Sequence, residues 1–141
     1  MIVADPKDAL LPLQKSYFDK LSAGLAQEVF DSVPEDGAMP FVTIGPFTAA
    51  DDSDKSEYGF QVTGSVQVWT SFPKNTGGRL SCLTIADDVI ALIRTRDDRI
   101  TVDGFNVVSS VLEFQDVIEE ETETERIYRC VLRFRHVIFQ N

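Results

Sequence analysis

The chain has few of the residues that most often build catalytic or metal sites, with one histidine and two cysteines among 141 residues. A single histidine excludes a site built from several histidine ligands, and a catalytic triad would have to recruit this residue, His136. Because neither a nucleophile motif nor a partner motif accompanies it, we expect His136 to be structural and to end a strand. Cys82 and Cys130 fall on apolar faces, which predicts reduced, buried thiols. The sequence therefore predicts no catalytic residue, no metal and no cofactor.

Basic residues and long apolar runs are scarce as well. Lysine and arginine number 13 against 23 aspartates and glutamates, so the net charge is −10. This charge disfavours contact with nucleic acid and with anionic membranes over most of the surface. No apolar run approaches the roughly 18 residues of a membrane span, and Met1–Asp8 lacks the basic and apolar regions of a signal peptide. We therefore expect a protein made in the cytoplasm that binds no membrane.

The composition that remains is typical of a globular protein, with 43% hydrophobic and 26% charged residues. A chain of this length suits one domain, which we expect to span residues 1–141. The most regular stretch is a strand at 59–73, in which Val62, Val66 and Val68 share one face. Trp69 alone interrupts the polar face of that strand. An amphipathic helix over 79–93 follows it and should cover the sheet.

The flanking segments complete an α+β fold, with a mostly antiparallel sheet packed against two helices. On the N-terminal side the pattern predicts a helix, a short extended segment, a short strand and a flexible acidic loop, at 8–25, 29–30, 41–45 and 48–58. On the C-terminal side, Asp103-Gly104 predicts a hairpin between 100–102 and 105–108, whose second strand continues to Phe114. An exposed turn at 119–125 and a last strand at 126–139 follow, giving a three-strand meander.

The last strand carries a row of arginines on the face opposite its apolar residues. Arg129, Arg133 and Arg135 would repel one another unless acidic side chains or a partner protein neutralise their charge. Either cross-strand acids such as Glu113 pair with them, or the row forms a subunit contact. Trp69 poses a similar question, because the first helix covers it or an interface uses it. These four residues are candidates for a subunit or partner interface.

Asp51, Asp52 and Asp54 form an acidic cluster in the predicted loop. Three carboxylates could hold a divalent cation, but they lack the regular ligand spacing and the distal glutamate of a calcium loop. A solvated loop explains them better. They join the candidate interface residues as charges that a partner could contact.

Four stretches occur along the chain in a set order: 29–34 leading into 40–45, 64–69 ahead of a helix, 103–108, and 131–135. Together with the leading helix they span nearly the whole chain. In this order and spacing they resemble the tail-completion family of tailed bacteriophages, which includes tail-terminator proteins and their gene-transfer-agent relatives. None of the stretches is a catalytic signature.

This resemblance implies a virion structural protein that is not an enzyme, made in the bacterial host cytoplasm and placed at the head-proximal end of the tail. It implies a homo-oligomeric ring, generally a hexamer, that ends the tail tube. Its partners would be the tail tube protein and the head-tail connector or stopper protein, and DNA would pass through the ring without sequence-specific binding. The alternatives are a cellular α+β adaptor or assembly chaperone, and a small hydrolase or ligand-binding domain with a pocket between helix and sheet.

Overall fold

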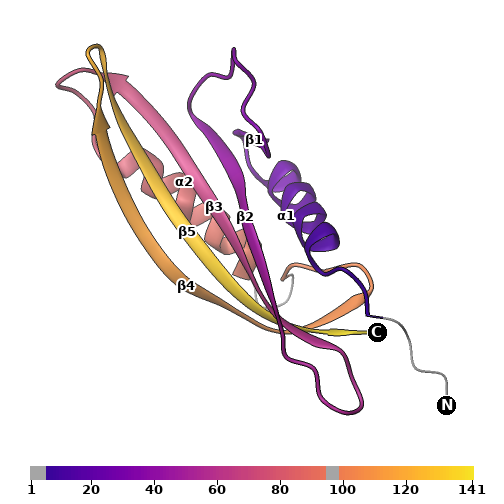
Figure 1. The fold of residues 1–141 in the computed structure, drawn as a ribbon. Coiled ribbons are helices and arrows are strands. Elements are labelled where there is room, and N and C mark those ends of the chain that lie inside the picture. The colour runs from indigo at the N-terminus through magenta and orange to yellow at the C-terminus, as the bar shows by residue number, and fades with distance from the viewer. Residues whose placement is uncertain (1–5, 95–98) are drawn as a thin grey trace.

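The computed structural model describes residues 6–94 and 99–141, so residues 1–5 of the segment considered for a signal peptide lie outside it. Five strands form one sheet, and two helices pack against one of its faces (Figure 1). In chain order the elements are α1 (Leu10–Gly24), β1 (Glu28–Phe30), β2 (Phe41–Asp51), β3 (Gly59–Pro73), α2 (Leu80–Arg94), β4 (Phe105–Glu121) and β5 (Glu125–Gln140). The predicted α+β class is confirmed. Within the described ranges, no helix is long and apolar enough to cross a membrane.

The strands lie in the order β1-β2-β3-β5-β4, and only β1 and β2 run parallel to each other. β3 and β5 form the centre, because all 15 residues of β3 pair with β5 from Gly59 opposite Phe139 to Pro73 opposite Glu125. Both helices begin and end within two residues of their predicted bounds. The strand predicted at 59–73 thus lies at the centre of the sheet, and the helix predicted at 79–93 packs against it.

The core lies between the helices and the even-numbered side chains of β3 and β5. Leu13, Tyr17 and Leu21 of α1 are fully buried there, and Cys82 and Cys130 are buried free thiols, as predicted. Gly64 of β3 lets α1 approach closely, since a Cβ atom there would lie 2.5 Å from Tyr17 Cζ. Backbone and aromatic ring therefore meet where a larger residue would push the helix away.

The predicted loop at 48–58 is wrong in its first part, because β2 continues to Asp51. Sequence reasoning ended the strand before Pro46, since proline lacks the N–H that a sheet requires. In the structure, the register between β2 and β3 shifts between Ile44 and Phe47, which leaves Gly45 and Pro46 outside the regular pairing. The loop itself covers only residues 52–58.

The predicted hairpin around Asp103-Gly104 is also wrong. The two residues do form a turn, with Phe105 N donating to Val102 O at 2.9 Å, but residues 99–102 form no strand. Ile100 and Val102 are buried in the core instead, so their apolar alternation reflects packing without strand pairing. The sheet therefore has a β4–β5 hairpin in place of the predicted meander.

The acidic stretch at 119–125 is mostly strand and not turn. β4 runs through Glu121, and only residues 122–124 connect it to β5. Arg126 makes this possible, because its guanidinium lies 2.6 Å from a Glu121 oxygen and 3.4 Å from a Glu119 oxygen. An arginine on the paired strand thus offsets the repulsion that the sequence predicts among the glutamates.

Candidate functional site

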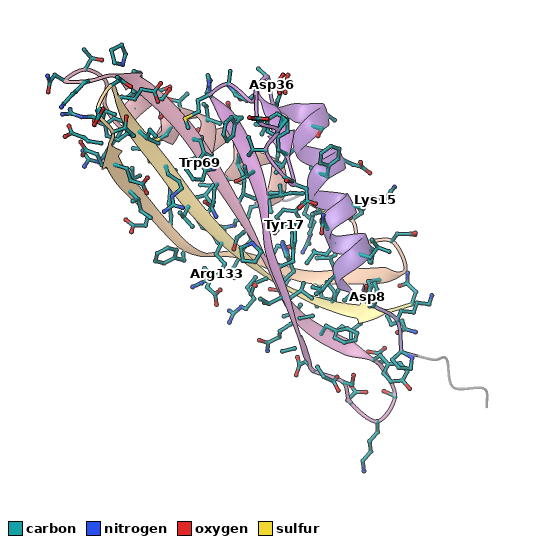
Figure 2. The ribbon with its side chains drawn as sticks, turned by 45° about the horizontal axis from the view of Figure 1, so that its top comes forward. Asp8, Lys15, Tyr17, Asp36, Trp69 and Arg133 are labelled. Carbon is teal, nitrogen blue, oxygen red and sulfur yellow. The ribbon has the colours of Figure 1, made fainter. Side chains whose placement is uncertain are left out.

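The face of the sheet that points away from α1 and α2, called the open face below, carries the odd-numbered residues of β3 and β5. The predicted interface residues Trp69, Arg129, Arg133 and Arg135 all lie on it, because side chains alternate along a strand. Figure 2 shows Trp69 and Arg133 on the strands and Tyr17 between α1 and the sheet. Within the described part of the chain, no helix covers the open face. The structure thus brings four of the seven candidate residues to one surface.

Trp69 is the centre of an aromatic cluster on this face. It pairs with Phe41 across the β2–β3 ladder, with ring centroids 6.2 Å apart, and Phe30 of β1 adds an edge contact to Phe41. Its Nε1 donates a hydrogen bond to Thr43 Oγ1 at 3.1 Å, and the Arg129 guanidinium lies 5.0 Å from its ring centroid. Trp69 stays half-buried. The expectation that the first helix covers it is therefore wrong, and the interface alternative stays open.

Two arginines of the row have side-chain partners within the same chain. Arg133 Nε donates to a Glu113 oxygen at 3.0 Å, which confirms the cross-strand pairing expected for it, and its guanidinium lies over Phe114. Arg129 Nη2 lies 3.7 Å from a Glu120 oxygen, and its Nη1 donates to Gln67 Oε1 at 3.3 Å.

The rest of the row keeps unused polar groups. Arg129 Nε is buried and has no hydrogen-bond partner among the described residues. Arg135 is exposed and makes no ion pair or side-chain hydrogen bond with residues 6–94 or 99–141. The buried Nε of Arg129 is closed to a partner, whereas the exposed guanidinium of Arg135 can donate hydrogen bonds to one.

Asp51, Asp52 and Asp54 lie apart from the arginine row, at the end of β2 and in the loop that follows. Hydrogen bonds from the side chain and backbone of Ser53 lower the pKa of Asp51. The pKa of Asp54 is lowered by donors of Ser56 and by the backbone N–H of Glu57. Asp52 N donates to Gly59 O at 2.7 Å. The carboxylates of Asp51 and Asp54 shape the loop by accepting bonds from its own backbone, and the described residues contain no group of three or more candidate metal ligands.

His136 is buried on the helix-covered face and lies four residues before the end of β5, so the prediction that it ends a strand is wrong. Its Nε2 lies 2.5 Å from the Tyr17 hydroxyl, and its Nδ1 lies 2.7 Å from Ser110 Oγ. Burial lowers its pKa to about 4, so the ring is neutral at pH 7. Although a serine touches a histidine here, the second ring nitrogen is held by tyrosine and not by a carboxylate. The three side chains connect α1, β4 and β5.

An open groove lies between α1 and residues 99–104, where a ligand-binding domain could place a pocket. Its walls include Lys15, Ser16 and Asp19 of α1, and Ser16 Oγ donates across it to Thr101 O. The described lining residues include no histidine or cysteine. Ser16, the serine of this lining, is held by its hydrogen bond to the Thr101 backbone.

Sequence reasoning missed the residues that surround Trp69 on the open face. Phe41, Thr43 and Gln67 reach it from the same or the neighbouring strand. Phe114 of β4 is 43% exposed on the same face. The alternation within each strand was visible, but the pairing that brings the strands together was not.

Comparison with known proteins identifies the family. The family model for tail completion protein gp17 matches residues 19–138. Among solved structures, a chain of the virion of a native gene transfer agent particle is similar, with a TM-score of 0.74 and 21% identity. The match covers 95% of this chain and 99% of that chain, so the two share a fold. No match was found among curated protein sequences. Because the family model spans most of the chain, the protein belongs to the tail completion protein gp17 family and is a structural component of a phage-type virion tail.

Proposed function

We propose that the protein forms a ring, generally a hexamer, that ends the tail tube at its head-proximal end and joins it to the head-tail connector. The observation that carries the proposal is the open face in a chain of the tail completion family. A sheet face with a half-buried tryptophan, stacked arginine and exposed phenylalanine has the composition of an interface centre. The exposed guanidinium of Arg135 adds donors that a partner can satisfy.

Charge supports a second copy as the neighbour. The protein is acidic overall, yet the open face carries Arg129, Arg133 and Arg135. A neighbouring copy that brings acidic side chains to these arginines makes a contact between two different surfaces. Contacts of this kind repeat around a ring when the rotation closes.

The remaining partners follow from the family and the charge. A ring at the end of a tube contacts the tail tube protein on one side and the connector or stopper protein on the other. A net charge of −10 lets DNA pass through without sequence-specific binding, because phosphates are repelled. We expect no chemical activity to be lost with the protein.

Electron microscopy of particles from a deletion strain tests this function. Loss of the protein should give tails of uncontrolled length, or tails and heads that do not join, and a plasmid copy of the gene should restore both. Tails of normal length joined to heads would contradict the proposal and favour an adaptor or chaperone.

A further inference from the structure

One edge of the sheet is unpaired along the second half of β2. β1 pairs only with Phe41–Thr43, whereas β2 continues to Asp51. From Phe47 onward β2 pairs with β3 on one side, and no described strand lies on its other side. Thr48, Ala49 and Ala50 are all exposed.

This β2 edge lacks the protection that strand edges usually carry. Native proteins block free edges with charged residues, proline, bulges or covering elements. The segment Phe47–Ala50 contains no charge and no proline, and it lies beyond the register shift at Ile44 and Phe47. Its two alanines leave room for another strand to approach. An unprotected edge in a soluble protein is a site that another strand can join.

The backbone geometry fixes which groups of β2 point outward. Asp52 N donates to Gly59 O, and hydrogen-bonded pairs alternate with unbonded pairs along an antiparallel ladder. Ala50 and Thr48 therefore bond to β3, whereas the N–H and C=O groups of Ala49 point away from it. Ala49 offers a donor and an acceptor to a strand outside the sheet.

The opposite edge of the same sheet is β4, and its second half is regular. Register shifts between β4 and β5 occur at Val107/Ser109 and Leu112/Phe114, but Gln115–Glu121 pairs one to one with β5. The bond from Thr122 N to Glu125 O sets the alternation, so the backbone groups of Val117 and Glu119 point away from β5. Val117 N already donates to the Asp116 carboxylate at 2.9 Å, which leaves the N–H of Glu119 for a partner strand. The glutamates of this half form ion pairs with arginines of the same chain. Their charge therefore protects the edge less than the sequence suggests.

The two free segments have compatible directions and a useful offset. β4 runs antiparallel to β2 within one sheet, so neighbouring copies in a head-to-tail ring present them antiparallel to each other. Ile118 of β4 lies level with Trp69 of β3, whereas Ala49 of β2 lies level with Val62, seven positions earlier. A sheet that closes on itself requires such a stagger between its edges.

We propose that Gln115–Glu121 of one copy adds as an antiparallel strand to Phe47–Ala50 of the next, so that the sheet continues across each subunit boundary. The inference rests on the proposed ring and specifies how its subunits join. The partner is a second copy of this chain, because one copy supplies both free edges and their stagger.

Hydrogen exchange of the full chain tests the pairing, with the separate subunit compared with the assembled ring or with isolated tails. Exchange at the Ala49 and Glu119 amides should slow by about 100-fold on assembly, because both gain hydrogen bonds. The Ala50 and Ile118 amides serve as internal controls, since their bonds within the sheet protect them before assembly.

A matched pair of variants gives a second measurement. Ala49→Pro removes the outward N–H and leaves the bonds from β2 to β3 intact, so the dissociation constant of the ring should rise by about tenfold or more. Ala49→Ser keeps the N–H and should assemble as the wild type does. Circular dichroism of both variants shows whether the subunit stays folded.

The outcomes separate this inference from the proposed function. A ring whose Ala49 and Glu119 amides stay fast overturns edge pairing and leaves the ring standing. Protection at one edge only overturns the pairing between copies and indicates a strand of another protein, or a two-fold contact. A chain that forms no ring, alone or in tails, with both edges fast, overturns the pairing and the ring together.

Discussion

The two faces of the central sheet use the same strands for opposite purposes. On the helix-covered face, Val62, Leu132 and Phe134 are fully buried. On the open face, the alternate residues Trp69 and Arg133 stay accessible, although their neighbours partly satisfy them. The first face determines whether the chain folds, because burial of its side chains supplies most of the stability. The second face is free to be shaped by a partner.

A pair of phenylalanine substitutions tests this division with the largest expected effect. Phe134→Ala should lower the free energy of unfolding by about 3–5 kcal/mol, because it leaves a cavity beside Tyr17. Phe114→Ala on the open face should cost about 1 kcal/mol or less, since Phe114 is 43% exposed. Urea unfolding of both variants measures the difference. Equal losses would show that the open face also supports the monomer.

The contribution of His136 to the dependence of stability on pH should report on the helix-covered face alone, because this residue is buried there. Its pKa is about 4 in the folded protein and about 6.5 in the unfolded chain, so the unfolded state binds more protons between these values. Stability from this residue should be full above pH 6.5 and fall by about 3 kcal/mol as the pH drops through 4. His136→Gln should lose this component while keeping the one from carboxylates. Identical pH profiles for the two proteins would contradict the assignment.

The open face should respond to charge at the level of assembly. Arg133→Glu reverses a charge beside Glu113 and should weaken ring formation by about tenfold while leaving the monomer folded. Lys15→Glu, on the exposed side of α1, is the matched control and should assemble normally. Analytical ultracentrifugation measures both. Unchanged assembly and unchanged yield of infectious particles would assign the arginine row to intrachain pairing alone.

The reactivity of the two thiols gives the smallest expected effect. It is measured on the unaltered chain. Cys82 and Cys130 are buried, and burial raises the pKa of each thiol above its usual value. Both should react slowly with a thiol reagent until urea unfolds the chain, as followed by mass spectrometry. Rapid labelling of the native protein would mean that the covered face opens readily.

Periodicity predicted the parts of the fold in which one face is buried. β3 and α2 show regular alternation and regular helical spacing, and both appear where the sequence places them. The predictions fail where one sequence pattern can arise from either of two physical causes. Ile100 and Val102 alternate like a strand but are buried without pairing, and Pro46 suggests a strand end where the strand only shifts register. Local sequence does not decide between these causes, since the answer depends on contacts far along the chain.

The candidate site follows the same division. Alternation in single strands placed Trp69 and the arginines on one type of face, and the structure agrees. Thr43, which accepts the hydrogen bond from Trp69, became apparent only from the register between β2 and β3. Asp51 and Asp54 looked like free charges, but they bind their own loop backbone. The role of Thr43 requires knowing which strands are neighbours, whereas the aspartate bonds are local and reach only two or three residues along the chain.

The uninterrupted pairing of β3 with β5 also sets a length. No register shift occurs along its 15 pairs, so these strands span roughly 50 Å between the loop at 52–58 and the turn at 122–124. A protein bound at one end is therefore held at a fixed separation from a protein bound at the other. Two residues added to each strand at matched positions would keep every side chain on its present face of the sheet. They would lengthen the distance between the two ends by about 7 Å.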